Sequence, residues 1–150
     1  MKKIIAAALF ASAFVSVGAH ATGGGGGSTT TTIPLVTGYN AIGNVTTNIN
    51  LARQYAFTAI ASRAGFIKND FEGTLSANVI AGLNDDAANN RMGVVAGSNK
   101  GYTVFTGSSV GGSVSQCGKP TAKSDTNLSA GLVVTGTLDL SKANGCNREI

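Results

Sequence analysis

Turn-forming residues interrupt the second half of the chain at short intervals, and this spacing constrains the fold more than any other feature. Residues 84–90, NDDAANN, and residues 98–101, SNKG, consist of polar and small residues that favour tight turns. The segments between such turns alternate apolar with polar or small side chains. Turns spaced about ten residues apart are typical of antiparallel sheets, whereas parallel strands need longer crossover connections. The pattern therefore predicts an antiparallel meander or sandwich.

Three stretches carry the strand pattern. Residues 73–83 alternate between apolar and other side chains, which predicts one half-buried strand. Residues 91–97 and 102–107 flank a turn and predict a hairpin. Residues 131–140 place Val134 and Leu138 on one face, and we expect a last strand there.

Residues 48–65 have a different period. The apolar residues of this segment recur three or four positions apart, at Ile49, Ala52, Ala56, Ala59 and Ile60. Asn48 can cap the start of a helix, and Gly65 can end it. We therefore expect one N-terminal α-helix over this segment.

The first 21 residues have the pattern of a secretory signal peptide. Lys2 and Lys3 precede the apolar run 4–17, and Ala19 and Ala21 occupy the small-residue positions of a cleavage site. A membrane span needs about 20 apolar residues, so we expect cleavage and no stable membrane insertion afterwards. The expected organisation is a signal peptide over 1–21, a flexible Gly/Ser/Thr linker over 22–32 and a single globular domain over 33–150.

The chain contains two cysteines, Cys117 and Cys146. Neither has the C-x-x-C spacing of a redox site, and an even number in an exported chain favours one structural disulfide. Such a bridge closes a loop of about 30 residues and contributes about 3–4 kcal/mol in the chain-entropy model. The expected fold class is thus α+β: a predominantly antiparallel β-sheet, as a meander or sandwich, with one N-terminal α-helix and a C-terminal region closed by the disulfide.

The linker leads into a segment that can pair as a strand with a sheet edge. One interpretation is that this segment returns to its own sheet. The other is that it adds to the sheet of a neighbouring copy, as in β-augmentation. The candidate strand-exchange segment consists of Thr32, Ile33, Pro34, Leu35, Val36 and Thr37.

The composition disfavours catalysis. The one histidine, His20, lies in the expected signal peptide, so the mature chain lacks the commonest general base and metal ligand. Residues 107–111, GSSVG, match the letters of a nucleophile elbow, but no histidine is left to activate the serine. Residues 84–90 offer oxygen ligands for calcium without the order of a known calcium loop, and a hairpin turn is the favoured interpretation. We expect no catalytic residue, no metal and no cofactor.

The charge and the aromatic content of the chain limit the classes of binding partner that we expect. Without Lys2 and Lys3, nine basic residues face seven acidic ones, and the charge falls to about +2. The basic residues are scattered rather than gathered with aromatics, so we expect no nucleic-acid binding. Aromatic residues at core-facing spacings are interpreted as core rather than as a surface that stacks on carbohydrate.

These observations favour a non-enzymatic exported protein. The first expectation is a structural or adhesive protein. One form of this expectation is a self-assembling subunit of a filament or matrix at the cell surface or outside the cell, with further copies of itself as the partner. The alternative is a small monomeric binding module, an inhibitor or ligand carrier, in the periplasm or secreted. The identity of any ligand or surface is not specified by the residues.

Overall fold

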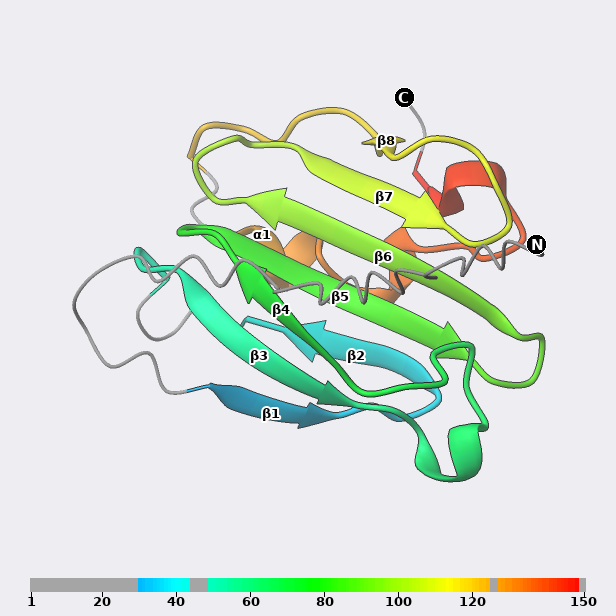
Figure 1. Cartoon of the computed structure of the whole chain (residues 1–150). Coiled ribbons are helices and arrows are strands. Elements are labelled where there is room, and N and C mark those ends of the chain that lie inside the picture. The colour runs from blue at the N-terminus through cyan, green and yellow to red at the C-terminus, as the bar shows by residue number, and fades with distance from the viewer. Residues whose placement is uncertain (1–29, 44–48, 125–126, 149–150) are drawn as a thin grey trace, which may run out of the picture.

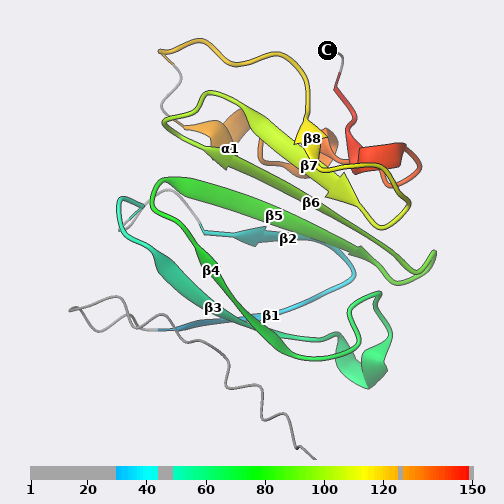
Figure 2. The ribbon, with the colours of Figure 1, turned by 45° about the horizontal axis from the view of Figure 1, so that its top comes forward.

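The computed structural model describes residues 30–43, 49–124 and 127–148. Two β-sheets and an irregular C-terminal segment form three layers, with the five-stranded sheet in the middle (Figures 1 and 2). The strands are β1 (Thr31–Pro34), β2 (Gly38–Ile42), β3 (Arg53–Thr58), β4 (Phe71–Leu75), β5 (Val79–Asp86), β6 (Arg91–Ser98), β7 (Val104–Ser108) and β8 (Ser115–Gln116). The helical turns are η1 (Ala61–Arg63), α1 (Leu128–Gly131), η2 (Thr135–Thr137) and η3 (Ala143–Gly145).

The middle sheet has the order β2-β5-β6-β7-β8, and all its strand pairs are antiparallel. Its side chains alternate between two apolar clusters. Ile80, Val95 and Val104 pack against the C-terminal segment, which supplies Leu128, Val133 and Leu138. Ala81 and Leu83 pack on the opposite side, in the cluster that contains Tyr55 and Phe57 of β3. Both faces of β5 are therefore buried.

The second sheet has the order β1-β3-β4, with β1 parallel and β4 antiparallel to β3. Tyr55 and Phe57 of β3 are buried two residues apart, as expected for one face of a strand. The ring of Phe57 stacks on the ring of Phe71 of β4, with centroids 4.5 Å apart. This sheet lies in front of the middle sheet in Figure 1, and the C-terminal segment lies behind it.

The expected N-terminal helix over 48–65 is wrong. Asn48 lies outside the described residues, and residues 53–58 form β3, followed by the short turn η1. The described residues contain no α-helix of seven or more residues. The alanines of this segment fit a helical period, but burial of Tyr55 and Phe57 between two sheets stabilises the extended form. Tertiary packing has overridden local propensity.

Two of the expected strands are also corrected. Residues 73–83 do not form one strand, because a turn at Ser76–Asn78, with Asn78 at a φ of 64°, separates β4 from β5. Residues 131–140 form no strand of a sheet, and only an isolated bridge joins Leu138 to Cys146. Leu138 enters the core as expected, but its buried companion is Val133 rather than Val134, which is only half-buried, so the expected apolar face is only partly correct.

The coarser fold expectation is confirmed. The sheets are mostly antiparallel, and the hairpin of β6 and β7 occupies the predicted position. The expected signal peptide and most of the linker lie outside the described residues. No helix in the described ranges is long and apolar enough to cross a membrane.

Tyr39 of β2 joins the middle sheet to the C-terminal segment. Its hydroxyl donates a hydrogen bond to the Val133 carbonyl oxygen, 2.7 Å away, and burial raises the pKa of the phenol. The ring lies over Gly82 of β5, where an added Cβ would collide with it. This close approach explains the need for glycine at position 82.

We expect Gly82→Ala to lower the free energy of unfolding by about 1–3 kcal/mol, because the Tyr39 ring must shift. Urea unfolding followed by circular dichroism measures the change. Gly136→Ala is the matched control, since a Cβ there meets nothing within 4 Å and its effect should stay within about 0.5 kcal/mol. Equal effects of the two substitutions would contradict the assigned contact.

Candidate functional site

The strand-exchange segment falls on β1 and on its connection to β2. Thr32, Ile33 and Pro34 belong to β1, and the remaining three residues lead to Gly38. Within the described part of the chain, β1 pairs only with β3, in a parallel register that places Thr32 opposite Ala56. The segment is therefore an edge strand, docked on its own sheet.

Alternate side chains anchor this edge strand. Ile33 is half-buried and Leu35 is buried, and both belong to the cluster between the two sheets. The Leu35 amide donates to the Thr58 carbonyl oxygen at 2.9 Å, which continues the pairing beyond the end of β1. Thr31, Thr32 and Pro34 are exposed.

The connection after Leu35 is held by Asn40 of β2. The Val36 amide donates to Asn40 Oδ1 at 2.9 Å, and Asn40 Nδ2 donates to the Val36 carbonyl oxygen at 2.9 Å. Asn40 Nδ2 also lies 3.0 Å from the Gly38 carbonyl oxygen, and the residue is only 7% exposed. The Val36 side chain itself is 57% exposed. Asn40 thus fixes the point about which the arm formed by residues 31–35 would have to swing.

Sequence reasoning missed Asn40. A short polar residue two positions after a turn glycine commonly bonds to nearby backbone, and Gly38 has a φ of 93°. That signal was present, but the second bonding group, the Val36 carbonyl, is set by the path of the chain between two sheets.

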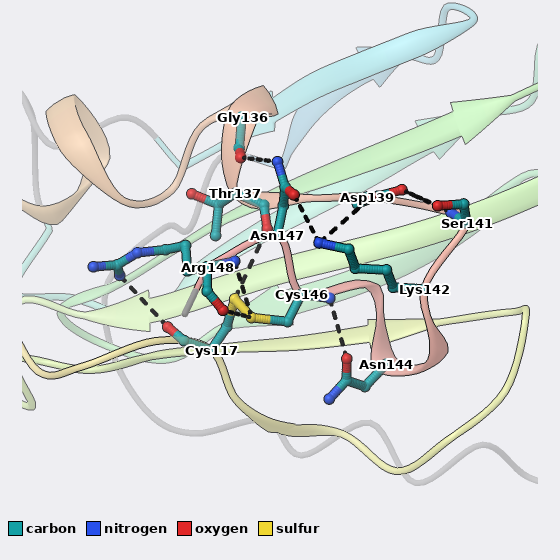
Figure 3. A network of polar contacts seen from close by, with 10 residues as sticks. All are labelled: Cys117, Gly136, Thr137, Asp139, Ser141, Lys142, Asn144, Cys146, Asn147 and Arg148. Carbon is teal, nitrogen blue, oxygen red and sulfur yellow. Dashed lines mark hydrogen bonds and ion pairs between the residues drawn. A yellow bond between two sulfur atoms is a disulfide. The ribbon is translucent and has the colours of Figure 1, made fainter. Parts of the chain in front are cut away.

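The predicted disulfide is confirmed. Cys117 and Cys146 are bonded, with Cα atoms 5.4 Å apart, and Cys117 is fully buried. Figure 3 shows the polar contacts around it: Asn144 Oδ1 accepts from the Cys146 amide at 3.1 Å, and the Asn147 amide side chain donates to the Gly136 carbonyl oxygen at 3.2 Å. The bridge fastens the end of the C-terminal segment to the residue after β8.

A polar cavity of about 550 Å³ opens between the β5–β6 hairpin and the C-terminal segment. The hairpin contributes Asn84, Asp86 and Arg91, and the C-terminal segment contributes Asp139 and Asn147. Arg91 Nη1 donates to the Leu140 carbonyl oxygen at 3.2 Å and so links the two walls. One wall comes from residues 84–90, which were considered above as calcium ligands, but their meeting with residues 138–147 is not visible in the sequence because the two walls are about 50 residues apart in the chain.

Both carboxylates of the cavity are held by hydrogen bonds. Asp86 accepts from the side chain of Asn89 at 2.7 Å and from its backbone amide at 3.1 Å, and these bonds lower the pKa of Asp86. Asp139 accepts from Ser141 Oγ at 2.6 Å and from the Ser141 amide at 2.9 Å, which lowers its pKa. Lys142 Nζ lies 3.6 Å from Asp139 Oδ2. Both groups carry their negative charge at neutral pH.

Asp85 of segment 84–90 and Ser109 of segment 107–111 make structural contacts in this arrangement. Asp85 is completely buried and accepts from the amides of Phe66 and Ile67 at 2.6 and 3.1 Å, so it supports the loop before β4. Its neighbour Asp86 points to the other face of the sheet. Ser109 follows β7 and its Oγ accepts from the Met92 amide at 2.8 Å, as in a turn between strands. In the described ranges, no three His, Cys, Asp or Glu residues are grouped to hold a metal.

No protein-family model matches the chain, and neither a curated protein nor a solved structure matches it at the significance required.

Removal of the disulfide should lower stability by about 3–4 kcal/mol, because the unfolded chain gains the freedom of a loop spanning 29 positions. Denaturant unfolding of the oxidised protein and of a Cys117→Ala/Cys146→Ala variant measures the difference. A loss below about 1 kcal/mol would show that the polar contacts of the C-terminal segment hold it without the bridge.

The carboxyl of Asp86 should titrate below the ordinary aspartate value, and Asn89→Ala should raise that midpoint, since the largest cause of the lowered pKa is removed. A lowered folded-state pKa adds stability above the unfolded-state pKa that is lost as the pH falls through the folded value. Carboxyl carbon chemical shifts followed against pH give both midpoints. Asp139 is the internal control, and its midpoint should not move.

Proposed function

We propose that this chain is a non-enzymatic exported protein with a structural or adhesive role, assembled by exchange of its N-terminal arm between copies. The observation that carries the proposal is that β1 is a terminal edge strand whose described strand pairing is confined to β3. A second copy can offer the same β3 edge in the same register, so exchange conserves the strand pairing.

The cost of exchange is concentrated at the hinge. On exchange, the Leu35 side chain of one copy would occupy the position that Leu35 of the second copy occupies in the monomer. The apolar area buried by Leu35 is therefore the same in the monomer and in the exchanged assembly. What is lost is the pair of hydrogen bonds between Asn40 and Val36, if the connection straightens there. A net contribution of about 0.5–1.5 kcal/mol for each bond makes Asn40 a lock that favours the closed monomer.

The disulfide supports the exported location. Disulfides persist in oxidising compartments, and Cys117 is buried in the apolar cluster beneath the middle sheet. The cell surface or extracellular space is the location proposed, with the periplasm as the alternative.

A second candidate function is a small monomeric binding module. The observation that favours it is the polar cavity between the hairpin and the C-terminal segment, which has the size of a small-molecule site. In that case the arm remains on its own sheet.

Cross-linking across the β1–β3 pairing tests arm exchange. Thr32→Cys and Ala56→Cys place two thiols at register partners, and oxidation of the mature chain at high concentration should give dimers and larger species on a denaturing gel. Asn40→Ala should raise that fraction several-fold, because the hinge loses its lock. Asn69→Ala, in the exposed loop before β4, is the control and should leave the fraction unchanged.

Monomeric, internally cross-linked chains at every concentration, with and without Asn40→Ala, would contradict arm exchange. Light scattering of the uncross-linked protein gives the independent reading of size. Assemblies that persist in a chain beginning at Val36, which lacks β1, would show that the subunits associate through another surface.

A further inference from the structure

We propose that the polar cavity between the β5–β6 hairpin and residues 138–147 binds a neutral sugar residue. Arm exchange does not account for this cavity: no residue of β1 lines it, although Thr37 at the end of the strand-exchange segment and the adjoining Gly38 form part of its wall. The inference therefore stands independently of assembly, and it supplies a ligand chemistry for an adhesive protein or a binding module.

The side chains of the cavity suit a ring of hydroxyl groups. Asp86, Asp139 and Arg91 are planar, and each has two adjacent polar atoms, as do the amides of Asn84 and Asn147. Part of this capacity is used within the protein: Asn147 Nδ2 and Oδ1 each have one partner already, as do both oxygens of Asp86. A ligand would use the lone pairs and N–H groups that remain. A vicinal diol can bond to such a pair of atoms at both of its oxygens. A hydroxyl both donates and accepts, so it can use the carboxylate acceptors and the guanidinium donors of one site.

These groups are held in place before any ligand arrives. Asn89 fixes Asp86, and Ser141 fixes Asp139. Lys142 Nζ donates to Asn147 Oδ1 at 3.0 Å, as Figure 3 shows. Asn147 is also held by its position directly after the disulfide-bonded Cys146. A preorganised site loses less side-chain entropy on binding, which matters for a small ligand.

The charges favour a neutral ligand. An anion would face the carboxylates of Asp86 and Asp139, both ionised at neutral pH, while a simple cation would share the site with Arg91; Lys142 is not part of the lining, but its Nζ lies 3.6 Å from Asp139 Oδ2. The opposite charges are close to balance, so hydrogen bonding rather than net charge selects the ligand. Leu138 and Leu140 add apolar surface that can contact the carbon-bound hydrogens of a sugar ring.

Saturation-transfer NMR on the mature, oxidised protein tests the proposal. The probes are the methyl glycosides of glucose, galactose, mannose and N-acetylglucosamine, each measured in buffer containing EDTA. We expect transfer to at least one glycoside, and about tenfold weaker binding in Asp139→Asn and in Asn147→Ala, the factor expected when one hydrogen bond to a charged or fixed group is lost. Glu72→Gln is the control, because this exposed carboxylate of β4 lies outside the cavity.

Each other outcome overturns the proposal. Transfer to none of the four glycosides would show that the cavity is not a sugar site. Transfer that Glu72→Gln weakens as much as Asp139→Asn would place the binding elsewhere. Binding that is seen only when CaCl₂ replaces EDTA would show that a calcium ion, rather than direct hydrogen bonds to the side chains, holds the glycoside. Amide spectra of each variant report whether it is folded, and a failed Asp139→Asn is replaced by Asn147→Ala, which leaves both carboxylates in place.

Discussion

Burial of β5 on both faces is the constraint on which the rest of the structure depends. Ile80 points to one apolar cluster, while Ala81 and Leu83 point to the other. A strand of this kind needs a covering layer on each side, because its apolar surface is otherwise exposed to water. The three-stranded sheet covers one face. The other face is covered by a C-terminal segment with little regular structure, which is held by the disulfide, by the hydroxyl of Tyr39 and by its own turns.

Both candidate sites lie where a covering layer ends. The arm is the edge of the three-stranded sheet, and its hinge is fixed by Asn40, a residue of the middle sheet. The cavity lies where the C-terminal segment meets the β5–β6 hairpin. The disulfide also holds the wall of the cavity that carries Asn147. The arm suits contact between copies, and the cavity suits contact with a small polar ligand.

The wrong predictions of secondary structure for residues 48–65 and 131–140 have one cause. Residues 48–65 place Ala52, Ala56 and Ala59 at helical spacing, yet Tyr55 and Phe57 of this segment are buried in a strand. Residues 131–140 alternate like a strand, yet among the residues that the structure describes none pairs with them as a strand beyond the bridge from Leu138 to Cys146. In each case the local pattern identified an apolar segment, and the available packing partner decided both the backbone conformation and which side chains are buried.

The sequence by itself determined the predominance of antiparallel strands, the β6–β7 hairpin and the pairing of Cys117 with Cys146, because these follow from alternation, turn residues and the presence of only two cysteines. Only the tertiary structure decided that β1 lies parallel to β3, that Asn40 holds Val36, and that Asp86 and Asp139 line one cavity. The physical reason is the separation along the chain of the residues that determine each feature. Turns and alternation are read from neighbouring residues, whereas these contacts join segments whose meeting depends on how two layers cover the middle sheet.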